Sequence, residues 1–128
     1  MTKKTPVIKP RVDTSNSLKR ERSKKFYHTR AWKNLRSQKK KQDRIKDLDR
    51  VVDYYEERSN ISSFDLNRFI ESDMPMCEEC ERNDELTPAY YLDHIKRIRA
   101  GGSKLDTDNL QWLCKLCDAK KRSLEGRE

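Results

Sequence analysis

Two pairs of cysteines constrain the fold of this chain more than any other feature of its sequence. Each pair has two residues between its members, and the four positions are Cys77, Cys80, Cys114 and Cys117. Two intervening residues let both sulfurs of one turn face a single ion, and two such turns complete the tetrahedral four-thiolate site that zinc prefers. A closed site of this kind has no open coordination position, so we expect a structural Zn²⁺ that contributes folding free energy.

The N-terminus and the distribution of apolar residues bear on the state of these thiols. The first residues, MTKKTPVIKPR, lack the apolar core of a signal peptide. No apolar run approaches the roughly 20 residues that a membrane span needs. We therefore expect a cytoplasmic protein without membrane contact, whose cysteines stay reduced and bind metal instead of forming disulfides.

The composition allows only a small core and places positive charge at one end. Of 128 residues, 33% are hydrophobic and 41% are charged, so we expect one small domain with extensions. The net charge of +8 is uneven, because residues 1–50 carry 18 Lys and Arg against 5 Asp and Glu, and residues 51–128 carry 12 against 17. A basic arm on an acidic body favours a nucleic-acid partner, with a disordered, merely solubilising tail as the alternative.

An amphipathic helix is predicted between Thr29 and Arg58, with a lapse of its apolar face at residues 39–42 where the helix could break. The apolar positions at helical spacing are Trp32, Leu35, Ile45, Leu48, Val52 and Tyr55. A second helix is predicted in SSFDLNRFIES (62–72), capped by Ser62 or Ser63. Its apolar contacts are expected from Phe64, Phe69 and Ile70. The two tryptophans, Trp32 and Trp112, are expected in the core.

The segment between the cysteine pairs is longer than a simple zinc site requires. It comprises 33 residues, 81–113, against the roughly 15 to 20 that are usual for paired cysteine turns. A β-favouring run at 89–95 predicts a strand that ends at Asp93 and His94. A loop at 96–109, a second strand at 110–114 and a helix at 117–126 are predicted to follow.

The residues around the cysteines resemble the HNH endonuclease family, particularly its small phage-encoded members associated with DNA packaging. The matching segments are FYHTRAWKNLR (26–36), the first cysteine pair, LDHI (92–95), GG (101–102), NLQWLCKLC (109–117) and a lysine shortly afterwards. The resemblance implies an α+β fold with a ββα-metal (HNH, His-Me finger) core, in which two strands and a helix hold one divalent ion beside the structural zinc. The chain is then divided into a basic, disordered arm at 1–25, a helical extension at 26–74 and a zinc-stapled nuclease core at 75–128.

Roles follow from this resemblance residue by residue. His94 matches the family's general base, Asp93 matches a metal ligand, and Asn109 matches the middle asparagine of the family name. The histidine that usually follows the second cysteine pair and ligates the ion is replaced by Asp118. Mg²⁺ and Mn²⁺ prefer oxygen donors, so a pair of aspartates suits either ion, with Ni²⁺ or Zn²⁺ as further candidates. Two alternatives stay open: that Asp118 only complements a helix dipole, and that His94 is only structural.

The function that the resemblance implies is a metal-dependent endonuclease that acts on double-stranded DNA and nicks it as a monomer. Phage DNA packaging, with terminase or portal proteins as partners in the host cytoplasm, is implied as well. Phosphate contacts are expected from two basic runs, which are otherwise simply solvated: Lys39, Lys40 and Lys41, and Lys120, Lys121 and Arg122. The alternatives are a noncatalytic zinc-ribbon module that binds nucleic acid and a packaging adaptor whose middle helices bind a protein.

Overall fold

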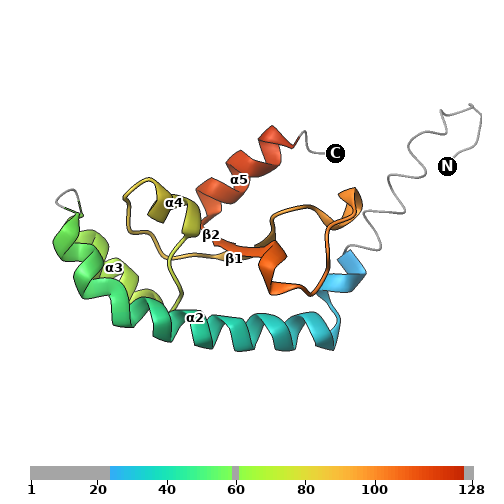
Figure 1. Ribbon diagram of the computed structural model, residues 1–128, viewed down its shortest axis with the longest axis horizontal. Helices are drawn as coiled ribbons and strands as arrows, with labels where there is room; N and C mark the ends of the chain where they lie inside the picture. The colour runs from blue at the N-terminus through green and yellow to red at the C-terminus, as the bar shows by residue number, and fades with distance from the viewer. Residues whose placement is uncertain (1–23, 59–60, 126–128) are drawn as a thin grey trace, which may run out of the picture.

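The computed structural model describes residues 24–58 and 61–125, so the predicted basic arm lies almost wholly outside the described residues. The elements are α2 (Arg30–Glu57), α3 (Ser63–Ser72), α4 (Glu78–Arg82), β1 (Tyr91–His94), η1 (Ile98–Ala100), η2 (Thr107–Asn109), β2 (Leu110–Leu113) and α5 (Lys115–Leu124). Figure 1 shows the two strands between the long helix α2 on one side and α5 on the other. The predicted α+β class is confirmed.

Helix α2 is continuous over 28 residues, so the break that the sequence allowed at 39–42 does not occur. Thr29 caps the helix, because its side-chain oxygen accepts a hydrogen bond from the backbone N–H of Trp32 at 3.2 Å. Within the polar stretch, Lys39 forms an ion pair with Asp43 one turn later at 2.8 Å. The helix thus stays continuous through the stretch without apolar residues, where polar side chains pair along its surface.

The buried face of α2 differs from the predicted one in the second half of the helix. Val51 and Tyr54 are buried there. Three of the predicted positions are exposed instead: Ile45, Leu48 and Val52. The reason is Asp47, whose buried carboxylate accepts a hydrogen bond from the backbone N–H of Met76 at 2.8 Å. Because Asp47 is acidic, the sequence pattern assigned its face of the helix to solvent, although that face is buried.

Helix α3 begins at the predicted cap, where the Ser62 side chain accepts a backbone hydrogen bond at 3.1 Å. Of its three predicted contacts only Phe69 is buried, and the predictions for Phe64 and Ile70 were wrong because both are exposed. At the other end, the Arg44 guanidinium of α2 donates hydrogen bonds to three carbonyl oxygens at 2.8 to 3.0 Å. Two of these carbonyls, those of Phe69 and Ile70, belong to the last turn of α3, which a helix leaves without intrahelical partners.

Two apolar clusters hold α2 against the rest of the chain. One joins α2 and α3 to the first cysteine turn and consists of Val51, Tyr54, Ile61, Phe69, Met76 and Leu86. The other joins the start of α2 to the strands and consists of Trp32, Ala89, Leu92, Leu110 and Trp112. Both tryptophans are therefore core residues, as predicted. The segments 26–74 and 75–128 share these buried residues.

Strands β1 and β2 form an antiparallel hairpin, shorter by one or more residues than the predicted strands. The register pairs Tyr91 with Leu113, Leu92 with Trp112, Asp93 with Gln111 and His94 with Leu110. Successive side chains of a strand point to opposite faces. His94 accordingly faces Trp32 of α2, whereas Asp93 faces Lys121 of α5.

The helix after the second cysteine pair begins two residues earlier than predicted, at Lys115, because Cys114 is its N-cap. The loop at 96–109 contains the two short 3-10 turns. Within the described part of the chain, no helix is long and apolar enough to cross a membrane.

Candidate active site

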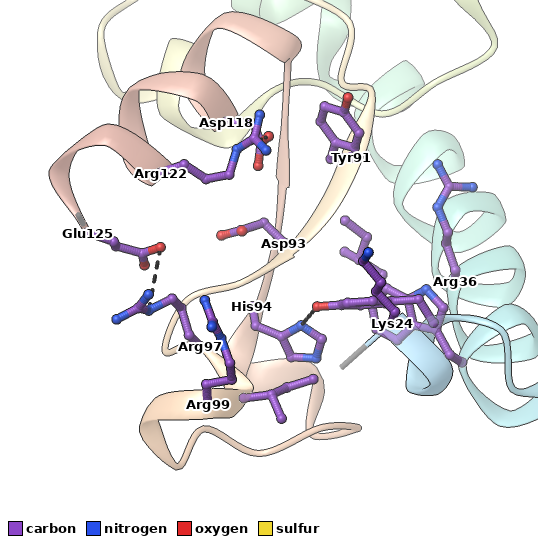
Figure 2. A pocket seen from close by; sticks show the side chains of 14 residues that line it. Lys24, Arg36, Tyr91, Asp93, His94, Arg97, Arg99, Asp118, Arg122 and Glu125 are labelled. Carbon is purple, nitrogen blue, oxygen red and sulfur yellow. Dashed lines mark hydrogen bonds and ion pairs between the residues drawn. The ribbon is translucent and has the colours of Figure 1, made fainter. Parts of the chain in front are cut away.

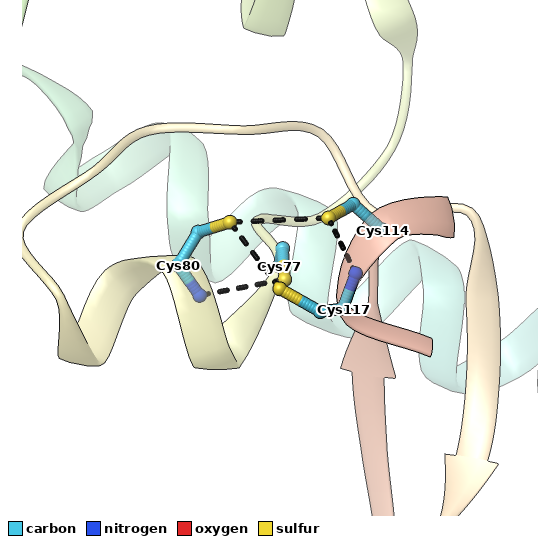
Figure 3. Close-up of side chains that lie close together, drawn as sticks. All are labelled: Cys77, Cys80, Cys114 and Cys117. Atoms are coloured by element: carbon cyan, nitrogen blue, oxygen red, sulfur yellow. Dashed lines mark hydrogen bonds between the residues drawn. The ribbon is translucent and has the colours of Figure 1, made fainter. Parts of the chain in front are cut away.

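The four cysteines meet where α4 and α5 begin (Figure 3). The sulfurs of the N-cap residues Cys77 and Cys114 accept hydrogen bonds from the backbone N–H groups of Cys80 and Cys117. The Cys80 sulfur lies 3.8 Å from that of Cys114 and 3.7 Å from that of Cys117, and all four sulfurs lie within 4.8 Å of one another. Sulfurs about 2.3 Å from a tetrahedral zinc are about 3.8 Å apart, whereas disulfide sulfurs are about 2.0 Å apart. The cluster has the dimensions of a four-thiolate metal site.

Asp93 of β1 and Asp118 of the first turn of α5 line one cleft (Figure 2). Each has a cation from α5 beside it: Lys121 Nζ is 3.3 Å from Asp93, and Arg122 Nε is 3.3 Å from Asp118. Burial raises the pKa of Asp93 above its usual value, and the charge of Asp118 adds to the rise. A hydrogen bond from Gln111, and the charge and hydrogen bond of Lys121, oppose it. A divalent cation would relieve both the burial and the repulsion of these carboxylates.

His94 is buried at 3% exposure, and both of its ring nitrogens have partners. Nε2 is 2.9 Å from the backbone carbonyl oxygen of Lys104, and Nδ1 is 3.1 Å from the hydroxyl of Tyr27, a contact marked by the dashed line at His94 in Figure 2. Trp32 stacks on the imidazole with ring centres 5.1 Å apart, and Phe26 lies 6.0 Å away. The imidazole therefore has one orientation, fixed by rings on one side and hydrogen bonds at both nitrogens.

Asn109 ties together the loop that carries Lys104. Its side-chain oxygen accepts a hydrogen bond from the backbone N–H of Lys96 at 2.8 Å. Its amide nitrogen donates to the carbonyl oxygens of Lys96 and Ser103 at 3.0 and 2.9 Å. Asn109 thus holds the loop whose Lys104 carbonyl oxygen faces Nε2 of His94.

The cleft has a volume of about 540 Å³ and a basic lining. Its cations come from segments far apart in the sequence, and they are Lys24, Arg36, Arg97, Arg99 and Arg122. Of these, the sequence prediction named only Arg122 as a phosphate contact. Tyr27 and Arg36 were missed although they lie in the FYHTRAWKNLR segment, because nothing in that segment shows that it packs along β1.

The other residues predicted to contact phosphate lie outside the lining of this cleft. One of them, Lys121, forms an ion pair with Asp93, which does line the cleft. Lys39 and Lys40 of α2 form ion pairs with aspartates at 2.8 and 3.7 Å. Lys41 on α2 and Lys120 on α5 are exposed.

The hairpin of β1 and β2 is followed by the helix α5, and Asp93, His94 and Asp118 line the cleft beside them. This arrangement defines a ββα-metal core. The family model described as HNH endonuclease matches residues 77–123. The chain also shares its fold with the HNH endonuclease of deep-sea thermophilic bacteriophage GVE2, solved with a manganese ion. The TM-score is 0.55 at 21% sequence identity, over 91% of this chain and 95% of that chain.

No curated protein matches the sequence. Residues 77–123 thus match an HNH endonuclease domain, and the family resemblance inferred from the sequence is confirmed for that segment.

Proposed function

We propose that this protein is a metal-dependent DNA endonuclease of the HNH type that hydrolyses phosphodiester bonds and nicks double-stranded DNA. The observation that carries the proposal is that Asp93, His94 and Asp118 line one basic cleft. All three residues lie within the segment 77–123 that matches the family. Carboxylates can hold a divalent ion, an imidazole can take a proton, and the surrounding cations can bind phosphate. One cleft of this kind in a monomer would cut one strand.

The four cysteines would hold a structural Zn²⁺, for which their sulfur spacing is suited. This ion would join the starts of α4 and α5. Because Asp118 directly follows Cys117, the zinc site would also fix the turn of α5 that presents the Asp118 carboxylate to the cleft.

Asp93 and Asp118 would hold Mg²⁺ or Mn²⁺, with Ni²⁺ or Zn²⁺ as the further candidates. Mg²⁺ keeps several water ligands and needs only one or two carboxylates, so two aspartates are enough. When bound, the ion would stabilise negative charge on the phosphoryl and leaving 3′ oxygens. Lys121 and Arg122 keep the two carboxylates oriented toward the cleft.

His94 would act as the general base. The Lys104 carbonyl can only accept a hydrogen bond, so Nε2 of His94 must carry a proton, and Nδ1 is the nitrogen left to receive one. Asn109 would keep that carbonyl in place. The attacking water would lose its proton toward Nδ1 as its oxygen forms the new bond to phosphorus.

The cations of the cleft would bind the scissile phosphate and its neighbours. Lys120 on α5 and the run Lys39 to Lys41 on α2 would contact phosphates further along the duplex. We further propose a role in phage DNA packaging in the host cytoplasm, with terminase or portal proteins as partners. Its support is the phage source of the similar structure and the exposed apolar stripe of α2 formed by Ile45, Leu48 and Val52.

Cleavage of supercoiled plasmid tests the proposed activity. Zinc-loaded wild type is compared with His94→Ala, Asp118→Ala and the control Asp53→Ala, which removes an exposed carboxylate of α2. Each protein is assayed with Mg²⁺, Mn²⁺, Ni²⁺ and Zn²⁺. We expect metal-dependent nicking by wild type and the control, and its loss in the other two.

Wild type that is folded and binds DNA but cleaves with none of these ions would support the noncatalytic zinc-ribbon module instead. Full activity of Asp118→Ala alone would reduce Asp118 to a helix-dipole residue.

A further inference from the structure

We propose that the hydroxyl of Tyr27 relays the proton from the attacking water to His94. This inference rests on the proposed nuclease function and adds a catalytic residue to it. It starts from the contact between the Tyr27 hydroxyl and Nδ1 of His94, 3.1 Å long, which joins residues 67 positions apart. The contact lies on the one ring nitrogen that is free to accept a proton.

The hydrogen-bond partners of His94 fix the direction of this contact. Nε2 faces a backbone carbonyl oxygen at 2.9 Å, which has no hydrogen to donate, so the Nε2 hydrogen points there. The neutral imidazole then has its lone pair on Nδ1. The Tyr27 hydroxyl must therefore donate to Nδ1, and its own oxygen lone pairs remain available to accept a hydrogen bond from water.

Exposure to solvent also favours Tyr27 over His94 as the group that meets water in the cleft. His94 is only 3% exposed, whereas Tyr27 is 39% exposed and lines the cleft together with Asp93 and Asp118. Trp32 covers the imidazole, and Tyr27 packs edge-on against Trp32 at 5.2 Å between ring centres. His94 also lines the cleft, but its imidazole offers water far less surface than Tyr27 does.

The protonation state of Tyr27 suits a relay. Burial is the main cause that raises the pKa of Tyr27 above its usual value of 10.0, and burial persists whichever ion the neighbouring carboxylates hold. The phenol therefore stays protonated at neutral pH and is held ready as a donor. A relay does not require the phenolate to accumulate, because the tyrosine gains one proton as it gives up another.

The step balances as follows. An O–H bond of water breaks and its hydrogen forms a new O–H bond on Tyr27, while the original Tyr27 hydrogen moves to Nδ1 of His94. The electron pair left on the water oxygen forms the bond to phosphorus. The bond from phosphorus to the 3′ oxygen breaks, and that oxygen leaves with its electron pair and takes a proton from solvent.

The experiment compares Tyr27→Phe with wild type and with Tyr90→Phe, which removes the hydroxyl of an exposed tyrosine outside the lining of the cleft. Single-turnover cleavage, DNA affinity, zinc content and melting temperature are measured for each. We expect Tyr27→Phe to lower the single-turnover rate by about 100-fold, within the range of lost acid–base catalysis, with the other three quantities unchanged. A loss smaller than about tenfold, or a gain, would overturn the relay and make the hydroxyl a mere cover for the base.

Two readouts report on the relay without depending on protein stability. In mixtures of H₂O and D₂O, the wild-type rate should curve with deuterium content because two protons move in one step, and a linear dependence contradicts the relay. Nitrogen NMR of His94 should show the hydrogen on Nε2 and a shift of Nδ1 in Tyr27→Phe, and a hydrogen on Nδ1 would contradict it. Activity lost in His94→Ala but kept in Tyr27→Phe rejects the relay alone, whereas an inactive wild type rejects the nuclease function too.

Discussion

The side-chain amide of Asn109 lies against Gly102, in space that only a glycine leaves open. A Cβ at position 102 would lie 2.9 Å from Asn109 Nδ2 and 1.8 Å from the carbonyl oxygen of Lys96, and real Cβ atoms essentially never lie within 3.0 Å of such groups. Any side chain there would push apart the loop that Asn109 ties together. The Lys104 carbonyl that faces His94 belongs to the same loop.

Gly102→Ala should therefore impair both folding and catalysis. We expect a loss of stability of about 1 to 3 kcal/mol, as for overpacked sites, and a cleavage rate at least about tenfold lower because Nε2 of His94 loses its fixed acceptor. Urea unfolding and plasmid nicking measure the two effects. Ala100→Ser, at an exposed position of the same loop, serves as the control. Unchanged nicking by Gly102→Ala would show that the loop does not position His94.

Removal of the metal from the four-cysteine site should unfold the domain. Burial raises the pKa of the Cys80 thiol to about 12, so a bound cation is what favours thiolates at this site. Binding of zinc by such sites contributes on the order of 10 kcal/mol, more than a small core can replace. We expect chelation, or Cys80→Ser, to abolish the cooperative thermal transition followed by circular dichroism, and added Zn²⁺ to restore it only in wild type. A chelated wild type that melts as before would contradict a structural role.

The buried Asp47 should matter to stability although it is not part of the lining of the cleft. Its carboxylate accepts a hydrogen bond from the Met76 backbone N–H at 2.8 Å and one from Arg50 at 3.0 Å, and so links α2 to the first cysteine turn. Asp47→Ala leaves a buried N–H without its acceptor, which costs about 1 to 3 kcal/mol. Urea unfolding should show this loss, and Asp49→Ala, at an exposed position of α2, should show little change. Equal stability of the two variants would argue against the link.

Tyr54 should make the stability of the fold depend on pH in the alkaline range. Its hydroxyl donates to the Glu85 carbonyl oxygen at 2.6 Å, and burial, aided by the charge of Glu81, raises its pKa from 10.0 to about 12. The stabilisation by the neutral phenol is complete below the unfolded pKa and is lost as the pH rises from about 10 to about 12. Tyr54→Phe should therefore lose less stability in that window, by on the order of 1 kcal/mol per pH unit. Urea midpoints from about pH 9 to about pH 11 that run parallel in both proteins would contradict this assignment.

The basic lining of the cleft should set the salt dependence of DNA binding. In a His94→Ala background, which prevents cleavage, Arg99→Gln and Arg122→Gln should each weaken binding irrespective of DNA sequence. Each should also lower the slope of log affinity against log salt concentration by about 0.9 per lost phosphate contact. Arg82→Gln removes an arginine outside the cleft, paired with Glu79, and should leave the slope unchanged. Identical slopes for all four proteins would place the DNA elsewhere.

Much of the fold was predictable because its signals are local. The serine cap at Ser62 and the strand that ends at His94 follow from residues a few positions apart. The face of α2 was mispredicted because its burial depends on Met76, which is distant in sequence and pairs with Asp47. Periodicity alone cannot show that a carboxylate will find a buried partner.

The sequence by itself determined the four cysteines of the predicted metal site, because the spacing within each short turn is a property of neighbouring residues. The resemblance to the HNH family then pointed to Asp93, His94 and Asp118 as the candidate chemistry. Only the tertiary structure decided what surrounds His94. The packing of Trp32 against the hairpin brings Tyr27 to the end of β1 and Arg36 to its start, and no local rule specifies these contacts. Contacts between distant segments depend on which helix and strand faces pack against each other, and that packing is decided by the core as a whole.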